Sequence, residues 1–163
     1  MSDPIPERIA AVIVSRLEAI TTANGYAFNV DSVVRPDRQG RVFTPKNNLI
    51  IVEQADSVPV PELDHPGNPP AICEALTFQI FAMNRPLDRS ETPVATNNNT
   101  LEACVKKAIC SPTDWHHFSN LAINAVFGTT QPCESSQGDH AGVMLPLIVT
   151  YPYSETDPYT VRR

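Results

Sequence analysis

Residues 76–82 read LTFQIFA, with an apolar side chain at every second position. Residues 143–151, VMLPLIVTY, and residues 121–127, LAINAVF, repeat the same period of two. Because successive side chains of a strand point to opposite faces of a sheet, the pattern predicts three strands, each with one buried face. Pro146 removes one donor from the hydrogen-bond ladder, which places the last strand at a sheet edge or beside a bulge. We therefore expect an edge strand that partner proteins can reach.

A helix is predicted on the N-terminal side of these strands. Residues 5–20 carry isoleucine, valine and leucine at helical spacing. Asp3 followed by Pro4 is typical of an N-cap and a first helical position. Gly25 tolerates the left-handed backbone that often ends a helix. Residues 26–34 then take on the β-rich composition of a strand.

A second helix is predicted between two of the alternating segments. Residues 101–109 are apolar at helical spacing, Asn99 or Thr100 can supply the N-cap, and Pro112 ends the helix. Residues 113–118 predict one further helical turn, whose two aromatic side chains pack inward while its two histidines face less buried ground.

Long irregular segments separate these elements. Residues 35–48 contain two prolines, a glycine and four basic residues, which indicates an exposed loop before a short strand at residues 49–52. Residues 56–70 contain five prolines and few core residues, so we expect a projecting arm or a rim. The expected fold class is α+β, in a single domain over residues 1–163 that ends in a tail at residues 152–163.

Composition excludes several classes of function. A net charge of -6 gives the chain no basic footprint for general nucleic-acid binding, although an acidic ring could still surround DNA and let it slide through. No apolar run approaches the roughly 20 residues that a membrane helix needs. Asp3 and Glu7 stand where a secretory signal would carry positive charge, so we expect a cytoplasmic origin.

The residues with catalytic potential cluster after the second predicted helix. Cys110, Asp114, His116 and His117 supply the residue types of nucleophilic catalysis, but no oxyanion loop or glycine-rich elbow accompanies them. The four cysteines lie 31, 6 and 23 residues apart, without the close pairs of a zinc site, and are expected to be reduced and mostly buried. The glycines form no phosphate-binding motif. We expect no catalytic, cofactor or metal site.

Loops and the tail remain as candidate contact surfaces. The basic loop at residues 35–48 is either a solvated hairpin tip or part of an interface or lumen. The tail combines tyrosines with prolines, which are large, stiff side chains that interfaces favour. The alternative is that the tail folds back on its own sheet.

The order of these elements resembles that of the tail terminator proteins of tailed bacteriophages, the minor tail protein U type of long-tailed phages and its relatives. The resemblance covers nearly the whole chain. It rests on the helix PERIAAVIVSRLEAI closing on NGYAF, the strand NVDSVVRP, the segment LIIVEQ, LTFQIFAM leading to the helix LEACVKKAI, and the end GDHAGVMLPLIVTYPYSETDPYT. Tyr151 and residues 157–159 lie where the family's last strand and acidic tail lie. HPGNPP and residues 115–117 depart from the family pattern.

The resemblance implies a mixed, mainly antiparallel sheet flanked by two main α-helices, in a structural virion protein without enzymatic activity. Six copies would form a ring at the head-proximal end of the tail tube, ending tube polymerisation and joining the tail to the head connector. The implied partners are other copies in a homo-hexameric ring, the tail tube protein, a head connector or neck protein, and a sheath protein if the tail is contractile. DNA would only pass through the ring lumen, no membrane is involved, and assembly takes place in the host bacterial cytoplasm.

The loops, the proline-rich stretch and the tail together supply the candidate interface residues. Two alternatives stay open: another phage neck or tail-completion protein, or a small cytoplasmic enzyme that uses Cys110 and the histidines after it. The candidate interface residues are Arg38, Arg41, Lys46, Leu63, His65, Tyr151, Tyr153, Asp157, Pro158 and Tyr159.

Overall fold

A computed structural model describes residues 3–36, 47–85, 92–134 and 140–162 of the chain. Within these residues six strands form one sheet in the order β1-β2-β3-β6-β4, and β5 also pairs with β6. Among the strands of the described residues, only β1 and β2 pair in parallel. The strands are β1 (Ser32–Val34), β2 (Asn48–Pro59), β3 (Ala71–Asn84), β4 (Asn124–Phe127), β5 (Gln131–Glu134) and β6 (Ala141–Ser154).

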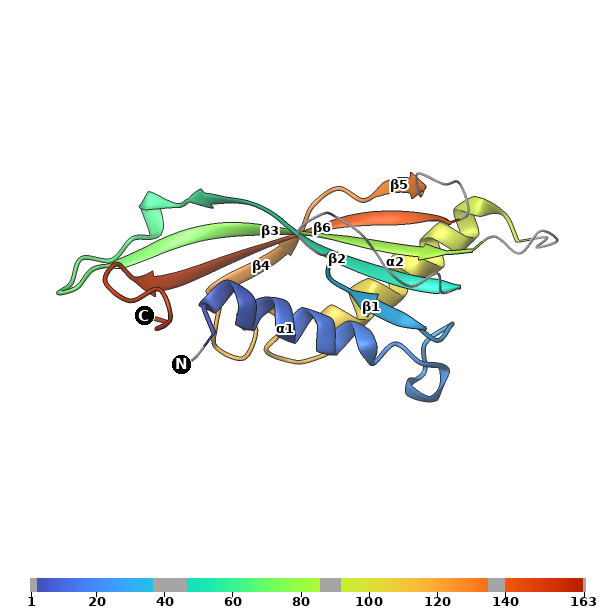
Figure 1. Cartoon of the computed structure of the whole chain (residues 1–163), viewed down its shortest axis with the longest axis horizontal. Coiled ribbons are helices and arrows are strands. Elements are labelled where there is room, and N and C mark those ends of the chain that lie inside the picture. Colours follow the sequence, from blue (N-terminus) through green and yellow to red (C-terminus); the bar gives the residue numbers. More distant parts are fainter. Residues whose placement is uncertain (1–2, 37–46, 86–91, 135–139, 163) are drawn as a thin grey trace.

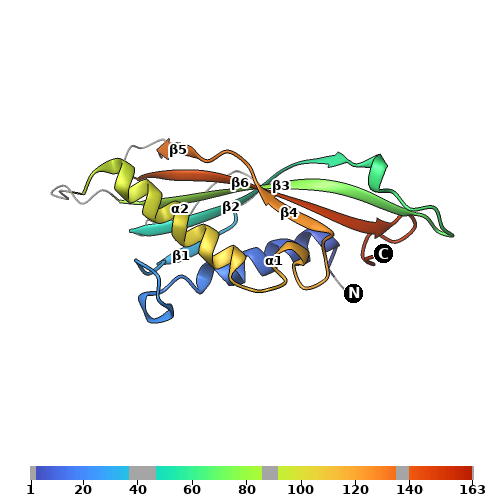
Figure 2. The same ribbon diagram turned by 180° about the vertical axis from the view of Figure 1, so that it is seen from behind.

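Both main helices, α1 (Ile5–Glu18) and α2 (Val94–Cys110), lie on the same side of the sheet (Figure 1 and Figure 2). Their apolar stripes meet the alternating apolar residues of β3 and β6, and these side chains form one buried cluster. The expected α+β fold with a mixed, mainly antiparallel sheet is confirmed. Leu76, Phe78 and Ile80 point into this cluster, as the period of two predicted.

The first helix begins later than predicted. Pro4 is its N-cap residue and no side chain caps it, so Asp3 does not take the predicted role. Gly25 does adopt left-handed backbone, with φ 77°, but it ends the short 3₁₀ turn η1 (Thr22–Asn24) and not the helix. The strand predicted over residues 26–34 is reduced to β1.

The second helix begins earlier than predicted, at Val94, so neither Asn99 nor Thr100 caps it. Asn97 and Asn84 exchange two amide hydrogen bonds of 2.6 and 3.0 Å, which tie the first turns of α2 to the end of β3. After α2, the predicted turn is present as the 3₁₀ turn η3 (Trp115–His117). Phe118 behind it is fully buried.

Two predictions about strands were wrong. The short strand expected at residues 49–52 is the start of the 12-residue β2, which runs on into the proline-rich stretch. The last strand, β6, is not an edge strand, because β3 pairs with one side of it and β4 and β5 with the other. Pro146 lies where the partner changes from β4 to β5, and its carbonyl accepts a 2.8 Å hydrogen bond from the Gly128 N–H. The other predicted form, a bulge beside Pro146, is not seen either, because β3 and β6 pair without a register shift through Gln79 and Pro146.

Candidate functional site

The sheet continues past the N-terminal end of α1 as an arm of three strands (Figure 1). We define the arm as residues 53–76 and 149–162. It contains the outer parts of β2, β3 and β6, the 3₁₀ turn η2 (Pro61–Leu63) and the C-terminal tail. Of the two forms expected for the proline-rich stretch, the structure shows the projecting arm.

Glu74 holds the three strands of the arm together on the side of the sheet that carries the helices. Its carboxylate accepts hydrogen bonds from Ser57 on β2 at 2.7 Å and from Tyr151 and Tyr153 on β6 at 2.8 and 3.0 Å. We call these four residues the carboxylate clamp. Burial alone would raise the pKa of the Glu74 carboxyl, but the three hydroxyl donors outweigh it and the pKa lies below its ordinary value.

The tail folds back along the arm. The Ser154 N–H donates to the Thr160 carbonyl at 3.2 Å, and Arg162 donates to the Asn68 carbonyl at 3.3 Å. Tyr151 is only 4% exposed and belongs to the core, whereas Tyr159 is 38% exposed. The described tail therefore matches the fold-back alternative, and the expectation of a surface tyrosine fails for Tyr151.

The arm carries the negative charge of the whole chain. It holds seven carboxylate residues and one arginine, a net charge of -6, whereas the other residues of the sequence hold eleven acidic and eleven basic residues. Such a segregated field favours contact with neutral or basic surfaces and repels acidic ones. The charged residues of the arm are Glu53, Asp56, Glu62, Asp64, Glu74, Glu155, Asp157 and Arg162.

Exposed apolar side chains accompany this charge. Val58 near the end of β2 is 58% exposed and Leu63 in η2 is 37% exposed. His65 is also exposed, and its backbone exchanges two 3.0 Å hydrogen bonds with Ala71, which closes the tip of the β2–β3 hairpin. Large apolar side chains at such a tip add little to the stability of the isolated chain.

The structure brings most of the predicted interface residues together in the arm. Leu63 and His65 lie at the hairpin tip; Tyr153 is half-buried in the clamp; Asp157, Pro158 and Tyr159 form the turn of the tail. Arg38, Arg41 and Lys46 lie outside the described residues. Sequence reasoning missed Glu74, although a charged residue in phase with the buried positions 76, 78, 80 and 82 was the signal for it.

The residues of the enzyme hypothesis are engaged in structural contacts. His116 and His117 place their Nδ1 atoms 3.3 and 3.4 Å from the carbonyl oxygens of Ala125 and Ala122. Burial raises the pKa of the Cys110 thiol, and nearby Lys106 and Arg16 do not offset it. A nucleophilic cysteine needs the opposite shift, toward the thiolate.

Arg16 on α1 contacts the end of α2 and the residue after η3, and its replacement by methionine provides a stability test. Its guanidinium donates to the Ile109 carbonyl at 3.0 Å and lies 4.7 Å from the ring centroid of Phe118. Arg16→Met should lower the free energy of unfolding by about 1 to 2 kcal/mol, because it removes both contacts. The side chain of Arg16 is only 10% exposed, so water does not readily replace them. Thermal unfolding measures the loss.

Arg35→Met is the matched control for Arg16→Met. Arg35 pairs with Glu7 at 2.6 Å, but both side chains are more than a third exposed, so the pair contributes less than about 1 kcal/mol. Equal losses in the two variants would show that Arg16 does not anchor η3 to α1.

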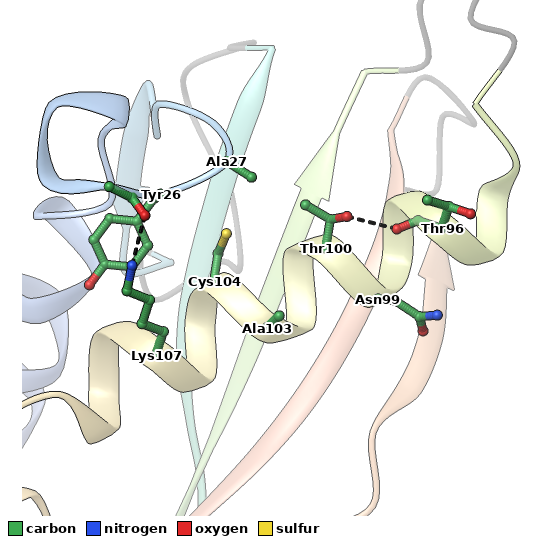
Figure 3. A pocket seen from close by; sticks show the side chains of 9 residues that line it. Tyr26, Ala27, Thr96, Asn99, Thr100, Ala103, Cys104 and Lys107 are labelled. Atoms are coloured by element: carbon green, nitrogen blue, oxygen red, sulfur yellow. Dashed lines mark hydrogen bonds between the residues drawn. The ribbon is translucent and has the colours of Figure 1, made fainter.

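A shallow groove of about 370 Å³ lies between α2 and the loop at Tyr26 and Ala27 (Figure 3). Lys107 points across it, but its ammonium donates to the Gly25 carbonyl at 2.7 Å and lies 4.6 Å from the Tyr26 ring centroid. Thr100 donates to the Thr96 carbonyl at 2.9 Å. These polar groups are satisfied within the chain, so they do not converge on a ligand.

None of the described helices is long and apolar enough to cross a membrane. In the described ranges no three His, Cys, Asp or Glu side chains lie close enough together to hold a metal ion. In comparisons with known proteins, no family model and no curated protein matches this chain.

Proposed function

We propose that the protein is a structural virion protein of a tailed bacteriophage, a tail terminator that forms a ring at the head-proximal end of the tail tube. The resemblance in element order supplies this identity, and the arm is the observation that supports an assembly role. A three-stranded extension with exposed Val58 and Leu63 and the chain's whole net charge presents a surface suited to a partner.

The mechanism is termination by surface mismatch. One face of the ring reproduces the stacking contacts of the tail tube protein, whereas the other face lacks them and fits the head connector or neck protein. Contacts around a ring are heterologous, so each copy uses two different surfaces. DNA passes through the lumen, and acidic walls let a polyanion slide without adhering. No step in this mechanism needs a catalytic residue.

Deletion of the gene from the phage genome tests the proposal. Tails should then have abnormal length, or heads and tails should fail to join, because nothing caps the tube and nothing fits the connector. Electron microscopy of lysates measures both outcomes. Normal joined virions from the deletion strain would refute the function.

Complementation with variants separates the assembly role from the enzyme alternative. A plasmid copy carrying Cys110→Ala or His117→Ala should restore joined virions as well as the unaltered gene does. Failure of a normally folded, ring-competent Cys110→Ala protein would favour the enzyme.

A further inference from the structure

The uncovered outer part of β2 and the strand β4 lie on opposite sides of the sheet and share the same rows of strand register. β1 pairs with β2 only at residues 49–51, so among the described strands none covers the outer side of β2 beyond that point. Strand register places Val58 in one row with Asn124 across β3 and β6, and Gln54 in one row with Phe127. We name residues 54–58 the β2 edge and residues 124–127 the β4 edge.

This alignment suits contact between two copies of the chain. A second copy moved sideways in the same orientation brings its β4 edge against the β2 edge of the first. The two strands are then antiparallel, which continues the alternation of the antiparallel strands within the sheet. Such a contact is head-to-tail, the type that closes into rings.

Each edge carries an exposed valine on the same face of the sheet. Val58 is 58% exposed and pairs with Ala75, and Val126 is 46% exposed and pairs with Ile148. Both pairs alternate with core residues, so both valines point away from the helices. If Asn124 of one copy lies opposite Val58 of the next, Val126 becomes a diagonal neighbour of that Val58, and the contact shields both valines from water.

Charge favours the β4 edge as the partner over a second β2 edge. The exposed Asp56 lies in the β2 edge and the exposed Glu53 directly precedes that edge, so pairing of two β2 edges would bring four carboxylates close together. Residues 124–127 read NAVF and carry no charge. Lys106 lies 5.8 Å from the ring centroid of Phe127, although it is also paired with Glu102.

Side chains contribute more to this contact than a backbone ladder does. Pro59 has no N–H, the β2–β3 register shifts between Gln54 and Ser57, and His116 already lies 3.3 Å from the Ala125 carbonyl. These features also prevent indiscriminate strand pairing. The row of Val58 and Asn124 is thus the centre of the contact.

We propose that the β2 edge of one copy packs against the β4 edge of a second copy of this chain, extending the sheet from subunit to subunit. This inference rests on the proposed ring, and it names the two surfaces that join neighbouring subunits.

Cross-linking of the purified chain tests the inference. The double variant Val58→Cys with Asn124→Cys places thiols directly opposite each other, within reach of a disulfide. Mild oxidation at high protein concentration should give a ladder of covalent multimers on a denaturing gel. Each single variant should give no more multimer than the unaltered chain, which sets the background of the native cysteines. Val58→Cys with Val94→Cys is the matched control, because Val94 is exposed on α2, away from the β4 edge.

A second variant does not depend on thiol chemistry. Val126→Asp sets a carboxylate against the acidic β2 edge and should weaken self-association about tenfold, measured as molar mass by light scattering. Val94→Asp should leave the mass unchanged. Circular dichroism confirms that both variants fold.

The outcomes separate this inference from the proposed function. If the double variant forms multimers but Val58→Cys and Asn124→Cys do not cross-link, the named surfaces are wrong and the ring proposal stands. The same holds if the single variant Val58→Cys cross-links to a second copy of itself. A chain that stays monomeric at every concentration overturns both.

Discussion

Gly142→Ala should lower the free energy of unfolding by about 3 to 5 kcal/mol, the largest loss that we expect from a single methyl group. Gly142 lies in β6 opposite Met83 of β3. A Cβ at this position would fall on the carbonyl oxygen of Ala82 and only 2.8 Å from the Cα of Met83. Both atoms belong to the backbone of a central strand, so relief requires β3 and β6 to separate. The melting temperature should fall by roughly 10 to 15 °C for a chain of this size.

Gly128→Ala is the matched control in the same part of the sheet. Its Cβ would meet the Cβ and Cγ atoms of Pro146 at 3.2 and 3.3 Å, which are side-chain contacts that a small shift relieves. We expect a loss below about 1 kcal/mol. Similar melting temperatures for Gly142→Ala and the unaltered chain would show that β3 and β6 have room that the structure does not contain.

The periodicity of the sequence predicted the central strands because their burial is one-sided. Residues 76–82 and 143–151 alternate, and the structure pairs these segments with each other through the core. The outer half of β2 could not be found in this way, since residues 53–59 are almost all exposed and show no buried period. Pairing with β3, and not burial of its own side chains, makes this segment a strand.

The position of β6 in the sheet was equally hidden from sequence reasoning. A proline usually marks an edge because it removes a ladder donor, yet here the missing N–H of Pro146 faces the place where β4 gives way to β5. The sequence shows that Pro146 has no backbone N–H to donate, but only the sheet topology shows which side of the strand lacks that hydrogen bond. Sequence reasoning failed at Asn97 for the same reason. Local capping rules began the second helix near Asn99, whereas the structure begins it at Val94 and joins Asn97 to Asn84 on β3 by side-chain hydrogen bonds.

The candidate site was predicted in part. The proline-rich stretch was predicted as a projecting arm or a rim because its composition packs poorly, and it lies in the arm. That this stretch and the tail form an interface stays a prediction. The carboxylate clamp was missed since its members are 57, 74, 151 and 153, which only the hairpin and the last strand bring together. The alternation of β3 marked Glu74 as a charged residue on the buried face, but no local pattern marks the hydroxyl groups from the other two strands that bind it.

Glu74→Ala should open the arm while the helix-covered part of the sheet stays folded. The substitution removes the acceptor of three hydroxyl groups and leaves the Tyr151 hydroxyl buried without its partner. Hydrogen bonds to a charged group contribute about 1.5 to 3 kcal/mol, so local opening should become on the order of 100-fold more frequent. Hydrogen exchange of the backbone amides in residues 71–76 and 149–154 measures this opening. Glu155→Ala, an exposed carboxylate of the same arm, should change exchange little.

The effect of Glu74→Ala should depend on pH in a defined direction. Because the folded pKa of Glu74 lies below its unfolded value, the clamp contributes fully above about pH 5, and its contribution is lost as the pH falls through the folded pKa. Burial first, and then Glu74, raise the pKa of Tyr151, so the contribution of that hydroxyl is present below about pH 10 and is lost at higher pH. The difference between variant and unaltered chain should be constant between these limits and shrink below about pH 4.

A double-mutant cycle distinguishes the clamp from a simple loss of packing. If the carboxylate and the tyrosine hydroxyl act as one unit, Glu74→Ala and Tyr151→Phe should be non-additive by about 1 kcal/mol, because the second change removes the hydroxyl that the first leaves unpaired. Additive effects, or exchange in the arm no faster than in Glu155→Ala, would mean that strand pairing alone holds the arm in place. The proposed contact between copies would require a rigid arm, since the row of Val58 and Asn124 aligns only while β2, β3 and β6 stay in register.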